Sequence, residues 1–348
     1  MPATPNSQSS SRATRVNRVT VLLRSGEGAR ALQAIGDRWS FLILRDAFLG
    51  ISRFEDLRRL TGAARGTLAA RLNSLVDQGV MYRNPYGLAP SRLEYRLTAK
   101  GLALYSVALS LWNWESRWAG EFGLPPRLLH KSCGKAMHPR LVCTHCREQI
   151  KPHDVEFEVG PGARHYSSGE PGERRRRSLP ADAAVGVDTT MFHSIDTIGD
   201  RWSGLLLAAL YFGLHRYDDI SAAMGIATNI LADRLRRLLA AGAIEQHLYQ
   251  DRPPRHEYRL TAKGWDLYPF VIALHDWATA WVPSPFGPGL KLRHRLCAHT
   301  LRSMMSCDQC DAAVDPREVG IKATRKWQES RLGGAVPARK TARRRPIN

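Results

Sequence analysis

The sequence predicts an α+β protein, mainly α-helical with small β-hairpins, in which one structural unit occurs twice. Three observations support this prediction: a long internal repeat, apolar residues at helical spacing followed by short strand-like runs, and a cysteine group behind each copy. The repeat is plainest in Gly36-Asp37-Arg38-Trp39-Ser40, which recurs 163 residues later as Gly199-Asp200-Arg201-Trp202-Ser203.

The two copies keep one register throughout, because Leu97-Thr98-Ala99-Lys100-Gly101 recurs as Leu260-Thr261-Ala262-Lys263-Gly264 at the same spacing. This indicates a duplication. Equivalent tryptophans also recur, and they are expected to lie in the core or between the copies, with a ligand pocket as the less favoured alternative. They are Trp39, Trp114 and Trp118 in the first copy and Trp202, Trp277 and Trp281 in the second.

Each copy is expected to begin with three helices. The first starts at the Gly-Asp-Arg-Trp motif and ends at Gly50, and the second runs from about Arg53 to Gly62. The Asp-Arg pairs Asp37-Arg38 and Asp200-Arg201 are interpreted as helix-start residues rather than catalytic groups. The third helix carries leucines at i, i+4 and i+7, namely Leu68, Leu72 and Leu75, repeated as Leu231, Leu235 and Leu238.

Two strand-like runs follow the third helix, which Gly79 or Gly242 closes. They span residues 80–83 and 93–97 in the first copy, and residues 243–249 and 256–260 in the second. A final long helix is expected to begin at Thr98 or Thr261 as N-cap. Helices joined by a tight turn and followed by a hairpin are the order of a winged helix-turn-helix domain.

The composition favours a polyanion as partner. The chain has 348 residues, 43% of them hydrophobic, and a formal net charge of +19. Such a charge favours nucleic acid, with an anionic membrane surface as the second possibility. Because we find neither a long apolar run nor an apolar signal segment, we expect a cytoplasmic, nucleoid-associated protein.

The two winged domains are expected at residues 26–119 and 189–282, with zinc knuckles at 120–160 and 283–325. Residues 161–188, rich in Gly, Pro, Ser and Arg, are predicted to form a flexible linker. Residues 1–25 and the basic residues 326–348 are predicted to be disordered.

All six cysteines belong to two groups of identical spacing, His130-x2-Cys133-x9-Cys143-x2-Cys146 and His294-x2-Cys297-x9-Cys307-x2-Cys310. A Cys3His set is typical of a closed structural zinc site, so we predict two zinc ions, one per copy. Free or redox thiols are the alternative. Four protein ligands leave no position for water, so an enzyme is not expected. The fourth ligand is less determined than the cysteines, because other histidines lie nearby: His138, His145, His153 and His299.

The ordered motifs at residues 34–39, 53–57, 68–72, 79–80 and 92–101, repeated in the second copy, resemble those of the HxlR-type winged-helix regulators, here with a zinc-ribbon-like extension behind each copy. The resemblance implies a bacterial transcription regulator from a family that commonly binds two-fold symmetric operators as homodimers. A fused pair is then expected to act as an intramolecular pseudo-dimer on an imperfect palindrome of double-stranded DNA. Further dimerisation stays open.

In this fold the third helix of each copy reads bases in the major groove, while the wing contacts phosphates or the minor groove. Arginine suits guanine and asparagine suits adenine. The alternative for each arginine is a solvated surface side chain. The expected base-reading residues are Arg65, Thr67, Arg71, Thr228, Asn229 and Arg234, and the expected wing contacts are Arg83, Arg92, Arg252 and Arg255.

The copies differ on this surface: Arg58 and Arg59 become Ser221 and Ala222, and Ala70 becomes Asp233. Their half-sites therefore need not be identical, and the alternative to an imperfect palindrome is that one half reads the DNA while the other mainly anchors. Residues 26–34 and 189–197 contain no cysteine, the residue that thiol-sensing relatives carry there. We therefore expect no redox sensing by that route, and either a small-molecule effector bound between the copies or no effector at all.

Two other classes of function are alternatives to a transcription regulator. A zinc-ribbon protein that binds RNA or serves as a protein-interaction adaptor would explain the cysteine groups alone. A zinc enzyme is disfavoured, because no acid, base or nucleophile recurs between the copies. The operator, the target genes and the direction of regulation do not follow from the sequence.

Overall fold

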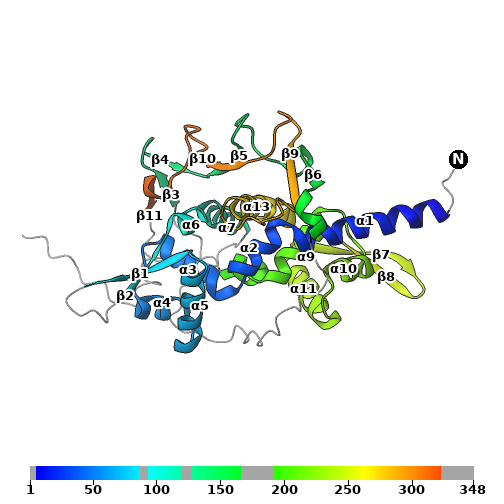
Figure 1. The fold of residues 1–348 in the computed structure, drawn as a ribbon, viewed down its shortest axis with the longest axis horizontal. Helices are drawn as coiled ribbons and strands as arrows, with labels where there is room; N and C mark the ends of the chain where they lie inside the picture. Colours follow the sequence, from blue (N-terminus) through cyan, green and yellow to red (C-terminus); the bar gives the residue numbers. More distant parts are fainter. Residues whose placement is uncertain (1–4, 87–92, 119–126, 166–191, 323–348) are drawn as a thin grey trace, which may run out of the picture.

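The computed structural model describes residues 5–86, 93–118, 127–165 and 192–322. Two helical units, each with a β-hairpin, lie side by side, and a layer of short strands covers one side of both (Figure 1). The predicted α+β class is confirmed, with helices in the majority. Within the described residues, no helix is long and apolar enough to cross a lipid bilayer.

The two units repeat the same order of elements. The first contains α2 (Glu27–Ile35), α3 (Arg38–Phe48), α4 (Phe54–Thr61), α5 (Arg65–Asp77), β1 (Met81–Pro85), β2 (Leu93–Leu97), α6 (Ala99–Leu102) and α7 (Tyr105–Trp118). The second contains α8 (Phe192–Ile198), α9 (Arg201–Tyr211), α10 (Tyr217–Met224), α11 (Thr228–Ala240), β7 (Ile244–Asp251), β8 (Pro254–Leu260), α12 (Ala262–Trp265) and α13 (Tyr268–Trp281).

Side-chain caps explain where several of these helices start. Asp37 accepts hydrogen bonds from the backbone amides of Trp39 and Ser40, and Asp200 does the same in the second copy. The predicted role of the Gly-Asp-Arg-Trp motif as a helix start is confirmed. Thr98 and Thr261 are N-caps as expected, but each caps only a short helix, so the single long helix predicted there is two helices, α6–α7 and α12–α13.

The N-terminal segment is a helix, α1 (Pro5–Ser25), so the prediction of disorder for residues 1–25 is wrong over this range. Val19, Leu22 and Leu23 are buried, and Arg12 forms an ion pair with Asp219 of α10. Only a few apolar residues lie among polar ones, and much of the surface that buries them, in α9 and α10, belongs to the second copy. A reading of local composition therefore misses this helix.

The two copies pack through α7 and α13, where the tryptophan contacts are reciprocal. The indole Nε1 of Trp114 donates to the backbone carbonyl of Lys263 at 2.8 Å, and that of Trp277 donates to the carbonyl of Lys100 at 2.9 Å. Each lysine ammonium also lies over the partner indole ring. These tryptophans therefore lie between the copies, in agreement with the sequence-based expectation.

The strand layer mixes the two copies. β6 pairs with β9, β3 pairs with β11, and β5 pairs with β10, so three antiparallel pairings join a strand of one copy to a strand of the other. The zinc knuckles predicted at residues 120–160 and 283–325 are thus not separate units. The strands of one knuckle alone are short and would leave their edge backbone groups without hydrogen-bond partners. The elements are β3 (Arg127–His130), β4 (Lys135–Met137), β5 (Arg140–Cys143), β6 (Val155–Val159), β9 (Leu290–His294), β10 (Ser303–Ser306), β11 (Val319–Lys322) and the 3-10 helices η1 (Pro152–Asp154), η2 (Pro161–His165) and η3 (Pro316–Glu318).

The start of the predicted linker is structured. Gly162, in η2, donates its backbone amide to the carbonyl of Pro288 at 3.0 Å, and Gly160 pairs with Gly289 in the same way. A Cβ at position 162 would lie 2.2 Å from the carbonyl oxygen of Gly287, so this close approach requires glycine. The rest of the predicted linker, from residue 166 on, and the basic tail at 326–348 lie outside the described residues.

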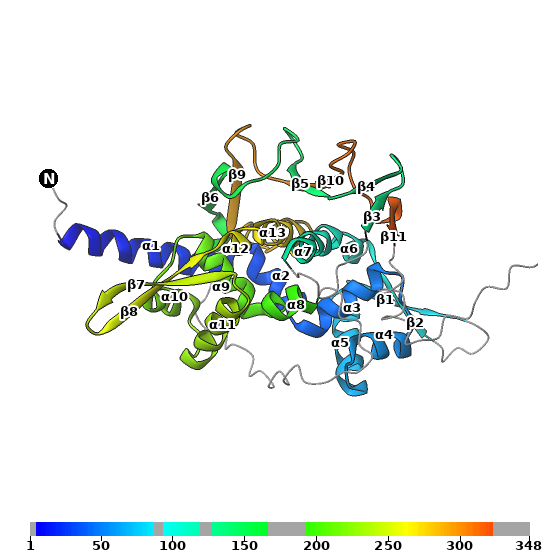
Figure 2. The same cartoon turned by 180° about the vertical axis from the view of Figure 1, so that it is seen from behind.

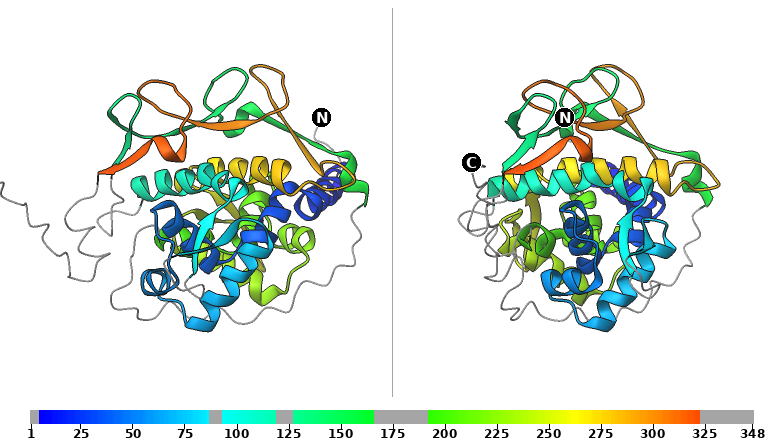
Figure 3. Two further views of the ribbon diagram at one scale, coloured as in Figure 1. Left: turned by 60° about the vertical axis from the view of Figure 1, so that its left-hand side comes forward. Right: turned by 90° about the vertical axis from the view of Figure 1, so that its left-hand side faces the viewer.

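The helices α5 and α11 lie on the face opposite the strand layer, and the hairpins β1–β2 and β7–β8 extend towards opposite ends of the molecule (Figure 2). The two side views show the strand layer lying across α7 and α13 (Figure 3). The copies are thus fixed to each other on one side and present equivalent helices on the other.

The buried position of Leu22 in α1 predicts that Leu22→Ala lowers the free energy of unfolding by about 2–4 kcal/mol, because it leaves a cavity against the second copy. Asn17→Ala, at an exposed position of the same helix, is the matched control and should have little effect. Urea denaturation of the full chain measures both. Equal stability of the two variants would show that α1 does not pack as described.

Candidate DNA-binding surface and metal centres

The helix-turn-helix of the first copy is α4, a short turn and α5. Gly62 ends α4 in the left-handed conformation, at φ 71°, and Gly225 does so at 62° in the second copy. Leu68, Leu72 and Leu75 of α5 are completely buried, so the opposite face of the helix is left to solvent. This is the arrangement expected of a reading helix.

Most of the predicted base-reading residues lie on that open face. Arg65 begins α5 with a side chain that is 77% exposed; it forms an ion pair with the exposed Glu55, and its guanidinium lies over the ring of Phe54. Thr67 is half-buried beside it. In the second copy Thr228 and Asn229 are exposed in the first turn of α11. These four residues can approach a DNA groove without any rearrangement of the helix.

Arg71 and Arg234 occupy the same position in the two copies and pair with the N-cap aspartates. Arg234 Nε lies 3.0 Å from Asp200 Oδ1, its guanidinium also contacts Asp233, and its side chain is only 10% exposed. The hydrogen-bonding groups of Arg234 are thus directed to the half-buried carboxylates of Asp200 and Asp233 rather than to the open face, which does not favour the predicted base contact. Arg71 lies 3.3 Å from Asp37 and is 43% exposed, so it is only partly committed.

The aspartate of the Gly-Asp-Arg-Trp motif consequently has two tasks. It caps α3 or α9, and it holds the arginine of α5 or α11. Asp233, which replaces Ala70 of the first copy, adds a second carboxylate around Arg234 and also pairs with Arg236 and Arg237. The reading helices of the two copies therefore present different charge to solvent.

Three of the four wing arginines predicted to contact phosphates lie among the described residues. Arg83 on β1 is exposed and donates to Asn73 Oδ1 at 2.7 Å, which links the wing to α5. Arg252 and Arg255 are exposed at the tip of the second hairpin. Arg92 lies outside the described residues.

Two further exposed arginines of the wings were not among the predicted contacts. Arg96 and Arg259 stand on β2 and β8 at equivalent positions, are more than half exposed, and pair with Glu94 and Glu257. Their recurrence 163 residues apart was the available signal.

The eight predicted metal ligands form two groups, and each group takes two residues from each copy. All ligand atoms within a group lie within 4.8 Å of one another. The predicted assignment of one complete ligand set to each copy is therefore wrong. One group is His130, Cys133, Cys307 and Cys310, and the other is Cys143, Cys146, His294 and Cys297.

Short turns present these ligands. The turn after each pair ends in a residue with positive φ: Gly134 and Arg147 in the first copy, Ala298 and Asp311 in the second. Each of these four donates its backbone amide to the carbonyl four residues earlier, as from Gly134 to His130 at 2.8 Å. Each turn thereby places the two ligand side chains of its pair on one side.

The geometry of the groups suits a tetrahedral ion. The thiol sulfurs of Cys133 and Cys307 are 4.0 Å apart, and those of Cys143 and Cys297 are 3.9 Å apart. Sulfurs bound to one zinc ion at 2.3 Å are about 3.8 Å apart. The Nδ1 atoms of His130 and His294 lie 3.3 Å from a cysteine sulfur of their own group. The other histidines that were considered as the fourth ligand belong to neither group.

Two of the thiols have a lowered pKa, which favours their thiolate form. A hydrogen bond from the backbone of Lys135 lowers the pKa of Cys133 to about 7, and one from His299 lowers that of Cys297 to about 6. Burial instead raises the pKa of Cys146 and of Cys307. Thiolates are the form that binds metal, so a bound cation would complete the charge balance of each group.

Comparison with known proteins matches the HxlR-like helix-turn-helix family at residues 34–122 and 197–285, about half of the chain. An uncharacterized HTH-type transcriptional regulator of Mycobacterium tuberculosis (H37Rv) is 45% identical over 134 residues, which are 38% of this chain and 85% of the relative. Another, of Synechocystis, is 37% identical over 91 residues, 26% of this chain and 67% of its own. The solved structure of PA1374 from Pseudomonas aeruginosa is 30% identical, covers 38% of this chain and 90% of its own, and has a TM-score of 0.31.

The two arginines of equivalent position give a prediction on stability. Arg234→Ala should lower the free energy of unfolding by roughly 3 kcal/mol, because it leaves Asp200 and Asp233 without their buried partner. Arg71→Ala should cost less than about 1 kcal/mol, because that pair is partly exposed. Chemical denaturation of the two variants measures the difference, and equal losses would show that Arg234 is no more committed than Arg71.

Proposed function

The chain belongs to the HxlR-like helix-turn-helix family of transcriptional regulators, and we propose that it binds double-stranded DNA sequence-specifically, its two copies acting as an intramolecular pseudo-dimer on an imperfect palindrome. The observation that carries the proposal is the placement of α5 and α11 on one face, with a wing at each end (Figure 2). Two readers on one face can enter successive major grooves of a duplex. The protein then works in the cytoplasm, at the nucleoid.

The charge and chemistry of this face support the proposal. Arg65 and Thr67 of α5, and Thr228 and Asn229 of α11, are the candidates for base contacts. Arg83, Arg252 and Arg255 of the wings are the candidates for phosphate contacts, and Arg92 remains one from the sequence. The net charge of +19 favours association with a polyanion at low salt.

Differences between the reading helices imply half-sites of different sequence. In the first copy Arg65 is exposed and held only by an exposed ion pair with Glu55, so it can exchange this partner for guanine, and Arg71 is partly available. The second copy offers Thr228 and Asn229, which favours adenine, while its arginine is held by Asp200 and Asp233. The palindrome should therefore be imperfect at the positions that these residues read.

Each Cys3His group is proposed to hold one structural zinc ion. The support is the donor set and the near-tetrahedral spacing of its atoms. Four protein ligands leave no open position, so the ion would staple strands together rather than activate water. Because each group draws on both copies, zinc would also lock the copies to each other.

The DNA proposal is tested by selecting bound sequences from a random duplex pool with the purified full chain. We expect two inverted, non-identical half-sites. Asn229→Ala should lose preference for one base in one half-site only, worth about 1–3 kcal/mol. Arg236→Ala, exposed near the far end of α11, is the control and should weaken all sequences alike. Recovery of no motif, or a preference for single-stranded RNA, would contradict the proposal.

Zinc content tests the ligand groups with two double variants. Cys143→Ser with Cys297→Ser removes two ligands of one group, so the protein should keep one zinc ion per chain. Cys133→Ser with Cys143→Ser damages both groups, so both ions should be lost. Metal analysis of the desalted proteins decides the matter. Ligand sets confined to single copies would give the reverse pattern, and a wild-type chain without metal would refute the zinc proposal.

A further inference from the structure

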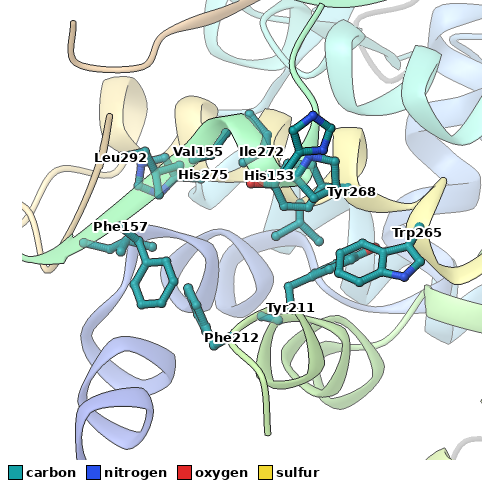
Figure 4. Close-up of a pocket in the computed structure, with 14 residues that line it drawn as sticks. His153, Val155, Phe157, Tyr211, Phe212, Trp265, Tyr268, Ile272, His275 and Leu292 are labelled. Atoms are coloured by element: carbon teal, nitrogen blue, oxygen red, sulfur yellow. The ribbon is translucent and has the colours of Figure 1, made fainter. Parts of the chain in front are cut away.

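A cavity of about 500 Å3 lies between the helices of the second copy and the strand layer. It lies between α9, α12 and α13 on one side and the exchanged strands β6 and β9 on the other. Figure 4 shows the rings of Phe157, Phe212, Tyr211 and Trp265 around it. A volume of this size is in the range of pockets for small organic ligands.

Two positions of the lining carry larger side chains in the first copy. Ala208, which lines the cavity, corresponds to Arg45, and His275 corresponds to Trp112. Arg45 is buried and paired with Asp46, and Trp112 is buried as well. At these two positions the fold can therefore hold more bulk than the second copy supplies.

The lining favours a flat, uncharged molecule. Phe157 and Phe212 meet edge to face, with ring centroids 4.7 Å apart, and Tyr211 contacts both Trp265 and Tyr268. Aromatic walls favour stacking with an aromatic guest. No Lys, Arg, Asp or Glu lines this cavity among the described residues, so nothing there would neutralise a charged guest.

One polar group in the lining has no partner. His275 is buried, and its Nδ1 makes no hydrogen bond, the nearest carboxylate oxygen being Glu27 Oε2 at 3.7 Å. Burial lowers the pKa of His275 to about 4, so the imidazole is neutral near pH 7. A neutral imidazole both donates and accepts hydrogen bonds, which suits a hydroxyl or carbonyl on the ligand.

We propose that this cavity binds an uncharged aromatic molecule of two or three fused rings with one hydroxyl or carbonyl group, which hydrogen-bonds His275. His153 also lines the cavity and its side chain is 74% exposed, which marks the way in. The cavity adjoins the base of the second wing, because Trp265 lies in α12 directly after β8 and Tyr211 donates to the carbonyl of Gly264 at 2.6 Å. An effect of the ligand on DNA binding rests on the proposed function, whereas its binding does not.

Calorimetric titration of the DNA-free full chain with 1-naphthol tests the site. One molecule should bind per chain, and His275→Trp, which installs the residue of the first copy, should weaken binding at least tenfold. Trp112→His is the matched control and should leave the affinity at the second copy unchanged. If His275→Trp lowers the melting temperature sharply, Ala208→Leu reports instead by filling the cavity from α9.

A second comparison tests the hydrogen bond. His275→Leu should weaken 1-naphthol roughly 3- to 10-fold, the size expected for one neutral hydrogen bond, and should leave naphthalene unaffected. No binding of 1-naphthol to the wild-type chain, or equal binding to the cavity-filling variants, would overturn the proposal. Failure to bind DNA would leave this result untouched, so the two proposals fail separately.

Discussion

The exchange of strands and metal ligands between the copies is the constraint on which the rest of the structure depends. Each ligand group takes a His-x2-Cys turn from one copy and a Cys-x2-Cys turn from the other. Three strand pairings cross between the copies in the same layer. Neither appendage can complete its sheets or its ligand set alone. The strand layer therefore fixes the position of one helical unit relative to the other.

That constraint matters for function because α5 and α11 lie on the opposite face (Figure 1). The helices α7 and α13, which reciprocal tryptophan contacts join, lie between the strand layer and the helices α5 and α11 (Figure 3). A homodimer uses identical surfaces at its two half-sites. In a fused chain each half can change independently, and the copies do differ here, because Asp233 and Asn229 stand where the first copy has Ala70 and Gly66.

The sequence predicted most of the local structure and all members of the ligand groups, but not the connections between the copies. Equal spacing in the two cysteine groups is unaltered when partners are exchanged, so it cannot reveal that Cys133 joins Cys307. Arg234 looks like a surface residue of a helix, because the carboxylate of Asp200 that buries it comes from a distant motif. Leu22 and Leu23 lie in a polar segment whose partner surface is in the other copy. Each of these three errors involved a contact distant in sequence.

Residue differences between the copies also bear on the cavity. Ala208 and His275 are smaller than Arg45 and Trp112 at the equivalent positions of the first copy, and no pattern of apolar residues records a missing volume. Duplication makes such changes readable, since one copy serves as the reference for the other. At these positions a large side chain packs in one copy, and a smaller side chain lines the cavity in the other.

The interlocking of the two copies is tested most directly by cutting the chain between them. A specific protease site introduced between residues 166 and 191 allows the folded, metal-loaded protein to be cleaved into two fragments. If the copies are interlocked, the fragments should co-elute in gel filtration at micromolar concentration and separate only after chelation and denaturant. Fragments that separate in native buffer with their metal retained would show that each copy folds and binds metal by itself, and would contradict the account.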